Sequence, residues 1–537
     1  MYGFSISKTG IITDNYYKSL GYYEDPASQG AYVMIRIFEN EIRVEQDFGG
    51  SYGLFLYENK EKNYFALSNS FLLLEEYLVE IQNISLNKDF ADNFIISGLC
   101  TPSIHETLIK EIYKLPSNVV IIINIKKKML NYFYIDYKEN TIPLESEEGL
   151  KIIDEWVDKW AYIFRSLEKQ TTNFCFDLSG GYDTRTVLSI LISSGLNLKN
   201  TFIKTSKDYN PDHFEDFKIA SNISSKFGFE LNKYEFNNES IIWSTNDTLF
   251  CSMYSKLGFH KEFYFKNKFY NKPRFVFTGF GGEIIRGYPG YSIKNYLKGI
   301  SSQAKQIIGH EEEFFNSSMR LCNRSVDLLK ERKSYSNDFE ISSDLYYRGR
   351  TRNHYGKASV EGFIANIYLI QPLIDPDIKR IKFNLNGKYS HDLIAYIYLR
   401  FAHDLIYFPI QGNRTLNQES IKKAQKIISL AGPYEIKTDF NENFFVDNKK
   451  KCPVPPSNEN LDADEYLKRF FNSSQFIENI NNVYDNSIYE WAKESSNKSN
   501  FFPLRHGYGL LAISITIKNL LRNQKYMNKS LESKKFE

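Results

Sequence analysis

Residues 174–195 read FCFDLSGGYDTRTVLSILISSG: an apolar run, a Ser-Gly-Gly turn, and a second apolar run with helical spacing. Glycines in such a strand-to-helix turn let backbone N–H groups approach an anion, because no Cβ atom stands in the way. The helix that follows adds the positive end of its dipole. Asp183 would repel a phosphate, but a carboxylate suits the Mg²⁺ that accompanies one. The stretch predicts a strand–turn–helix unit for a metal-bound phosphate; the alternative is a plain turn in which Asp183 caps the helix.

A second stretch, residues 274–288 (RFVFTGFGGEIIRGY), repeats this order of strand, glycine turn, carboxylate and helix. Glu283 takes the place that Asp183 has in the first stretch. In an open parallel sheet, ligands bind at the carboxyl ends of the strands. If the two strands are neighbours, Asp183 and Glu283 face opposite sides of one metal–triphosphate. Other phosphate-loop and nucleophile motifs, such as GxxxxGK[ST], GxGxxG, HExxH and CxxC, do not occur in the sequence.

The composition argues against several classes of protein. Among 537 residues, 67 Lys and Arg stand against 65 Asp and Glu, so no charge excess favours nucleic acid or an anionic membrane. The five cysteines include no closely spaced pair, which argues against a disulfide framework or a zinc site. The longest aliphatic run, residues 119–125, is too short to span a bilayer. We expect a cytoplasmic protein with no nucleic-acid or membrane partner.

The chain has two parts with different patterns. Up to about residue 145, short β-rich segments such as AYVMIRIFEN and NVVIIINIKKKMLNYFYIDY alternate with polar turns, and SFLLLEEYLVEIQ has helical spacing. Beyond it, alternating helices and strands predict a parallel sheet covered by helices. These elements are expected at 148–170, 173–178, 184–194, 201–205, 214–227 and 229–236. We place a domain boundary near residue 145, and predict that 434–461 is an exposed loop before a C-terminal helical section.

The motif strand-SGGxD[ST]-helix resembles the pyrophosphatase loop of enzymes that cleave ATP to AMP and pyrophosphate. The order of motifs is similar to that of the class B asparagine synthetase family: MYGF at 1–4, SGGYDT at 179–184, TGFGGEI at 278–284 and YLIQPLID at 368–375. The resemblance implies an α/β protein with two domains. Residues 1–145 would form a β-rich sandwich like that of Ntn hydrolases, as a degenerate glutamine amidotransferase domain. Residues 146–537 would form a synthetase domain with the parallel sheet of adenine-nucleotide alpha-hydrolases (the PP-loop fold) and a helical C-terminal section.

The resemblance also implies the cofactors and the site. ATP and Mg²⁺ are expected, with Asp183 and Glu283 as metal ligands. Phe280 and Tyr368 take the places of two glutamates that contact substrate in the family, and they complete the expected catalytic set. The residues expected to bind ATP or pyrophosphate are Leu178, Ser179, Gly180, Gly181, Asp183, Thr184, Lys204, Thr278, Gly279, Arg350 and Arg352.

Departures from the family pattern change the expected activity. Tyr2 stands where the family has the cysteine that attacks glutamine, and a phenol with a pKa of about 10 cannot replace that thiolate. We therefore expect no glutaminase activity. Phe280 and Tyr368 replace charged side chains, so the activated carboxylate should differ from aspartate, because polar contacts determine which substrate is accepted.

Two further segments are candidates for anion contacts. YYRGRTRNHYGK, residues 346–357, has arginines at alternate positions, which predicts an extended segment with one basic face; a solvated basic stretch is the alternative. FPIQGNRTL, residues 408–416, is a weaker candidate for closing the site over pyrophosphate.

The predicted function is an ATP-dependent ligase that activates a carboxylate as an acyl-adenylate and passes it to ammonia or an amine. The carboxylate would belong to a small molecule, a sugar acid or a peptide, and a homodimer is compatible with the sequence. One alternative is an intramolecular amide-forming cyclase of the β-lactam or lasso-peptide type. The other is a nucleotide-binding scaffold that has lost catalysis. Asp183 and Glu283 favour an enzyme, whereas Tyr2, Phe280 and Tyr368 favour the scaffold.

Overall fold

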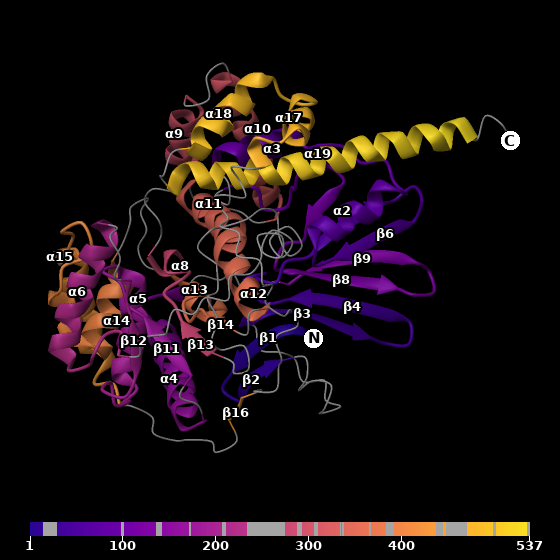
Figure 1. Ribbon diagram of the computed structural model, residues 1–537. Helices are drawn as coiled ribbons and strands as arrows, with labels where there is room; N and C mark the ends of the chain where they lie inside the picture. The colour runs from indigo at the N-terminus through magenta and orange to yellow at the C-terminus, as the bar shows by residue number, and fades with distance from the viewer. Residues whose placement is uncertain are drawn as a thin grey trace.

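The computed structural model is of mixed α/β type, which confirms the expected class (Figure 1). It contains a mixed seven-stranded sheet in the N-terminal half and a parallel four-stranded sheet in the C-terminal half. The structure describes residues 1–13, 29–97, 101–135, 142–170, 173–206, 211–233, 274–286, 293–305, 310–332, 335, 338–364, 367–382, 391–435, 444–446, 470–497 and 501–533.

The N-terminal half is a sandwich of two sheets. Its strands are β1 (Tyr2–Ser7), β2 (Gly10–Thr13), β3 (Gly30–Ile37), β4 (Glu41–Gln46), β5 (Phe55–Asn59), β6 (Tyr64–Ser68), β7 (Ile112–Lys114), β8 (Val119–Asn124) and β9 (Met129–Tyr134). The larger sheet has the order β16-β2-β1-β3-β4-β8-β9, where β16 is Phe445–Val446, and the smaller has the order β6-β5-β7. Val33, Val44 and Ile121 of the larger sheet share an apolar cluster with Leu56 of the smaller one.

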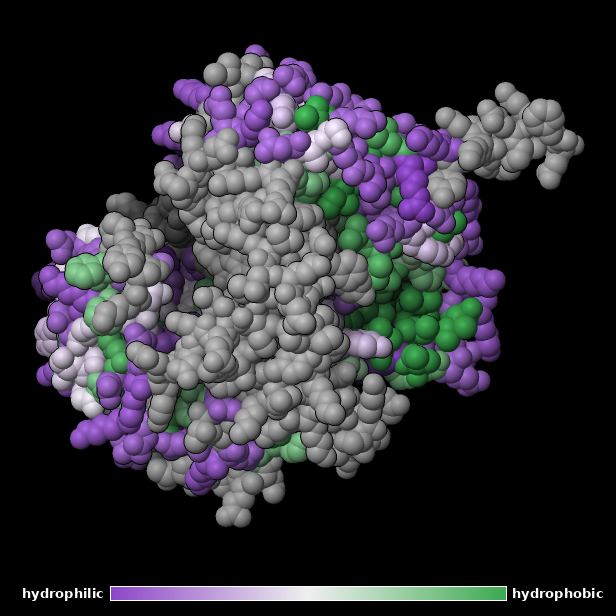
Figure 2. Space-filling view, viewed as in Figure 1, coloured by the Kyte–Doolittle hydropathy of each residue, from purple (hydrophilic) through white to green (hydrophobic). Residues whose placement is uncertain are grey.

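The elements predicted in this half are confirmed. AYVMIRIFEN contains β3, NVVIIINIKKKMLNYFYIDY contains β8 and β9, and SFLLLEEYLVEIQ contains helix α2 (Phe71–Val79). Ser70 caps α2, because its hydroxyl oxygen accepts a hydrogen bond from the N–H of Leu73 at 3.1 Å. Figure 2 shows apolar side chains gathered over the outer strands of the larger sheet, where Phe133 of the edge strand β9 is 56% exposed.

The C-terminal half contains the parallel sheet, with the order β12-β11-β13-β14. Its strands and main helices are α4 (Glu147–Gln170), β11 (Phe174–Asp177), α5 (Tyr182–Ser193), β12 (Phe202–Lys204), α6 (Pro211–Phe227), β13 (Arg274–Phe277), α12 (Lys357–Ile364), β14 (Ile367–Ile370), α14 (Asp392–Phe401) and α15 (Gln418–Ala431). The alternation predicted from residue 148 to 227 is confirmed. Of the strand predicted at 229–236, the structure shows one bridge, Leu231 to Ile203, and residues 234–236 lie outside the described residues.

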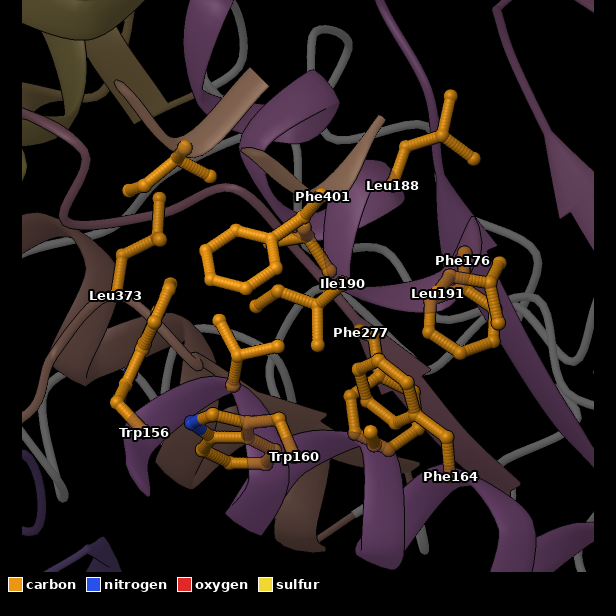
Figure 3. Packing of buried hydrophobic residues seen from close by; sticks show 14 of the residues in the cluster. Trp156, Trp160, Phe164, Phe176, Leu188, Ile190, Leu191, Phe277, Leu373 and Phe401 are labelled. Carbon is orange, nitrogen blue, oxygen red and sulfur yellow. The ribbon is translucent and has the colours of Figure 1, made fainter. Parts of the chain in front are cut away.

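Successive residues of each strand point to opposite sides of the parallel sheet, and side chains on both sides are buried. On one face, Phe164 of α4 packs edge-on against Phe176 and Phe277, with ring centroids 4.8 Å apart in both pairs (Figure 3). Trp160, one helical turn earlier, also packs on Phe277. On the other face, Cys175 belongs to a separate buried cluster. This packing holds β11 and β13 side by side and thereby positions the turns that follow them.

A second core joins the C-terminal helices to the N-terminal half. Its helices are α2, α3 (Lys88–Ser97), α9 (Ile293–Ala304), α10 (Glu311–Arg332), α17 (Ser474–Asn481), α18 (Asn486–Asn497) and α19 (Phe501–Ser533). Helix α19 runs across α2 and α3 (Figure 1). Glu75 of α2 is fully buried there and accepts a hydrogen bond from Thr516 of α19. The predicted C-terminal helical section is confirmed, and no helix among the described residues is both long and apolar enough to cross a membrane.

Two strand pairings cross the boundary predicted near residue 145. Strand β10 (Ile142–Pro143) pairs in parallel with β15 (Ile381–Lys382) of the C-terminal half. Strand β16, which lies within the predicted loop 434–461, pairs in parallel with β2 of the N-terminal sheet. Strand pairing therefore joins the two parts of the chain.

Candidate functional site

The two glycine turns lie in direct contact at the carboxyl edge of the parallel sheet. They follow β11 and β13, which are neighbouring strands paired in register from Phe174 to Phe176. A Cβ atom at Gly279 would lie 2.5 Å from the backbone nitrogen of Thr184, and one at Gly282 would lie 2.0 Å from the carboxyl carbon of Asp183. Only glycine at these two positions allows the turns to approach this closely. The structure thus brings the two predicted turns together.

The N–H groups of the first turn are bonded within the protein. Ser179 N–H donates to the hydroxyl of Thr184 at 3.0 Å, and Gly181 N–H donates to the hydroxyl of Ser179 at 3.1 Å. Gly180 N–H donates at 2.7 Å to the carboxylate of Asp216, a residue of α6 that sequence reasoning missed. No side-chain hydrogen bond caps α5 at Gly181. An anion at this turn would therefore meet the N-terminus of α5 first, and would have to replace these acceptors to use the turn itself.

Asp183 forms a bidentate ion pair with Arg286. Arg286 is the last residue of the short helix α8 (Glu283–Arg286). Its Nε lies 2.7 Å from Oδ1 of Asp183, and its Nη2 lies 2.8 Å from Oδ2. The two side chains are 12% and 22% exposed, so solvent screens the pair only in part. Sequence reasoning missed Arg286, although its position three residues after Glu283 on a helix was a usable signal.

Glu283, the first residue of α8, is the second carboxylate of the site. Its Oε1 accepts a hydrogen bond from the hydroxyl of Tyr346 at 2.9 Å. Burial raises the pKa of Glu283, and the nearby charge of Asp183 raises it further, against the opposing charge of Arg286. No group of three or more His, Cys, Asp or Glu side chains suited to a metal occurs among the described residues. A metal held by Asp183 and Glu283 would therefore need phosphate or water oxygens to complete its coordination.

The 408–416 segment contacts the first turn; that it closes the site over pyrophosphate stays a prediction. Gln411 N–H donates to the carbonyl oxygen of Gly180 at 3.1 Å. The fully buried Arg185 of α5 binds three carbonyl oxygens, those of Gly180 at 2.9 Å, Phe408 at 3.2 Å and Pro409. Arg185 thereby fastens the segment to the turn, and this contact was not predicted.

Two arginines and a histidine lie close to the ring of Tyr182 at the start of α5. The guanidinium carbons of Arg286 and Arg414 lie 6.0 and 5.9 Å from the centre of the Tyr182 ring. His391 packs on the same ring, with centroids 4.7 Å apart. Burial lowers the pKa of His391 to about 4, and the charges of Arg286 and Arg414 contribute, so this imidazole is neutral at pH 7. These charges favour an anion at the N-terminus of α5.

One expected catalytic residue belongs to the core. Tyr368 is fully buried in β14 and packs against the rings of Phe4, Phe275 and Phe363. Lys204 lies at the same carboxyl edge of the sheet as the first turn, where it ends β12 and forms an ion pair with Asp177, the last residue of β11, at 3.0 Å.

Other expected residues form the backbone frame of the turns. The N–H of Leu178 donates to the carbonyl oxygen of Lys204 at 2.8 Å, and that of Thr278 donates to Ile370 at 3.0 Å. Phe280 is half-buried in the second turn, and its N–H is 3.4 Å from the hydroxyl of Thr278.

The prediction of an extended basic face at 346–357 is wrong. Residues Tyr346–Gly356 form a π-helix, η4, in which alternate residues point in different directions. Arg352 is buried and donates to the carbonyl oxygen of Gly50 at 2.9 Å, in the N-terminal half. Arg350 lies with its guanidinium carbon 5.2 Å from the ring centre of Tyr346. The side chains of His354 and Lys357 lie outside the described residues.

Tyr2 is an exposed residue of β1, paired in register with Val33.

Comparison with known protein families and with curated proteins gives no match for this chain. Close to the point where the two glycine turns meet, the described residues bring together two carboxylates, Asp183 and Glu283, and two arginines, Arg286 and Arg414.

Proposed function

We propose that this chain is an ATP-dependent amide-forming ligase of the asparagine synthetase type, with a PP-loop synthetase domain and an N-terminal domain related to Ntn hydrolases. One observation carries the proposal: two glycine turns, each followed by a carboxylate, meet at the carboxyl edge of neighbouring parallel strands. That edge is where open α/β sheets bind their ligands. In the reaction a carboxylate oxygen attacks the α-phosphorus of ATP, pyrophosphate leaves, and the acyl-adenylate then reacts with ammonia or an amine to release AMP.

The residues of this chain would bind and orient the nucleotide. The N-terminus of α5 and the Ser179–Gly181 turn would receive the phosphates, and Arg414 would add a positive charge. Mg²⁺, when bound, would neutralise part of the triphosphate charge. Asp183 and Glu283 fit this role by donor type, and the guanidinium of Arg286 already shows that a cation is stable against Asp183. Positioning and charge stabilisation would supply most of the rate enhancement.

The test of this proposal is the identity of the nucleotide products. Purified protein is incubated with Mg-ATP, ammonia and pools of amino acids, sugar acids and peptides. We expect AMP and pyrophosphate in amounts that depend on one carboxylate pool. Accumulation of ADP and phosphate instead would replace the acyl-adenylate by an acyl-phosphate.

The nitrogen source is a separate expectation. Because Tyr2 cannot act as the glutaminase nucleophile, glutamine should not be hydrolysed, and ammonia or an amine should be required. Release of glutamate from glutamine above the rate without protein would contradict this expectation.

A second candidate function is a nucleotide-binding scaffold without catalysis. The ion pair between Asp183 and Arg286 favours it, because both oxygens of an expected metal ligand are already bonded. The product analysis separates the two functions, since a scaffold would bind Mg-ATP without forming AMP.

A further inference from the structure

Asp183 is held from two sides in this structure. Arg286 uses two nitrogens to bond both of its carboxylate oxygens, at 2.7 and 2.8 Å. From the other turn, the backbone at Gly282 lies so close that a Cβ atom there would be 2.0 Å from the carboxyl carbon. The carboxylate therefore cannot turn away from Arg286 without moving the second turn. Arg286 occupies the side of the carboxylate that faces it, so a metal ion that binds Asp183 from that side must replace at least one of the two hydrogen bonds.

The two carboxylates of Asp183 and Glu283 are more stable with the guanidinium of Arg286 near their charges than with no cation beside them. Glu283 lies close enough to Asp183 for the two negative charges to repel, and the Tyr346 hydroxyl holds Glu283 in place. Arg286 follows Glu283 by one helical turn and neutralises one of these charges. A lone Mg²⁺ would have to displace this guanidinium and push it into a region that already contains the positive charge of Arg414. A metal that arrives with phosphates brings the negative charge that can accept the displaced guanidinium.

We propose that Arg286 is the resident counter-ion of Asp183 and exchanges partners when the nucleotide binds: the metal takes Asp183, and the guanidinium takes a phosphate oxygen. The inference rests on the proposed nucleotide site and adds a residue and an order of events to it. The chain then binds the metal more tightly together with phosphates than alone. A metal without phosphates leaves the displaced guanidinium of Arg286 without a negative partner.

The metal half of the exchange is tested with Mn²⁺ alone, which prefers the same oxygen ligands as Mg²⁺ and whose free and bound forms differ in their electron paramagnetic resonance signals. Arg286→Gln should bind Mn²⁺ about tenfold more tightly than the wild type, since a charge-assisted bidentate pair no longer competes. Arg286→Lys, which can bond one oxygen at a time, should fall between the two. The double variant Asp183→Asn with Arg286→Gln should lose the gain, which assigns it to Asp183.

The phosphate half is tested with inorganic tripolyphosphate in the presence of a chelator. Asp183→Asn frees the guanidinium from its charged partner, so this variant should bind tripolyphosphate several-fold more tightly than the wild type. Adding Arg286→Gln to it should abolish the gain.

The matched control is another bidentate pair of the same kind, Arg400 with Asp154, with nitrogen–oxygen distances of 3.0 and 2.8 Å between α14 and α4. Arg400→Gln and Asp154→Asn should change neither binding of Mn²⁺ nor binding of tripolyphosphate. Equal Mn²⁺ affinity in wild type and Arg286→Gln would overturn the proposal, as would a gain of the same size in Arg400→Gln. Neither probe requires ligase activity, so absence of AMP formation would refute the proposed function and leave these binding results to decide the role of Arg286.

Discussion

Replacing Glu75 by glutamine should stabilise the protein at neutral pH. Glu75 of α2 is fully buried against α19, and its Oε2 is 3.3 Å from the hydroxyl of Thr516. Burial raises the pKa of Glu75 from 4.5 to about 8. In the unfolded chain this carboxyl loses its proton near its ordinary pKa, whereas the folded protein keeps it protonated up to about pH 8. The free energy of unfolding therefore falls as the pH rises between these two values.

The size of the effect follows from the distance between the two pKa values, since each pKa unit corresponds to about 1.4 kcal/mol. At pH 7 the free energy of unfolding of the wild type is lower, by on the order of 3 kcal/mol, than at a pH where Glu75 is protonated in both states. The difference approaches about 5 kcal/mol once the folded carboxyl also ionises. Glutamine has nearly the shape of the neutral acid and does not ionise, so Glu75→Gln removes the loss.

The assay is thermal unfolding at one scan rate at about pH 5.5, 7 and 8.5. The control is Glu76→Gln, which removes the same charge from the neighbouring, exposed position on α2. The melting temperature of Glu75→Gln should exceed that of the wild type by an amount that grows with pH, whereas Glu76→Gln should follow the wild type. Identical behaviour of the two variants at every pH would refute a buried neutral carboxyl between α2 and α19.

Three other substitutions probe the contacts around the site and the second core. Gly282→Ala should destabilise the protein by about 1–3 kcal/mol or more, because the new Cβ atom would overlap the Asp183 carboxyl. Gly299→Ala, in open space on α9, should be neutral or stabilising. Equal melting temperatures of the two variants would refute the close contact of the turns. Arg185→Met should release the 408–416 segment, seen as faster hydrogen exchange at Gln411, and unchanged exchange would contradict the proposed fastening. Burial lowers the pKa of His310, but hydrogen bonds to Asp485 and Glu313 outweigh it, so the pKa is raised. His310→Gln should therefore remove a stabilisation that is full below about pH 6.5 and fades as the pH rises through this raised pKa; a pH-independent difference in melting temperature would count against it.

The glycine turns and the alternating elements after residue 148 could be predicted because their signals are local. Apolar periodicity identified α4 and β11, and the rule for parallel sheets put the two turns at one edge. The contact of the turns at Gly279 and Gly282 follows from the same rule together with the absence of a side chain.

The partners of the site residues could not be predicted, because they depend on segments distant in sequence. Arg286 bonds Asp183 from 103 residues away, and Asp216 reaches Gly180 from another helix. The alternate arginines suggested an extended strand, but η4 is helical and Arg352 is buried against Gly50 of the N-terminal half. The resemblance to the family predicts Tyr368 in the site, yet its position in β14 directs the ring into the aromatic core.

The central claim is that Asp183 and Glu283 form a metal-dependent nucleotide site where the two turns meet. The most direct test measures, by calorimetry, the affinity for a non-hydrolysable ATP analogue with Mg²⁺ and with a chelator. In the wild type and in the Asp154→Asn control, Mg²⁺ should strengthen binding by about tenfold or more. In the double variant Asp183→Asn with Glu283→Gln, the two affinities should be nearly equal, because no carboxylate remains to hold the metal. A double variant in which Mg²⁺ strengthens binding as much as in the wild type would contradict the claim.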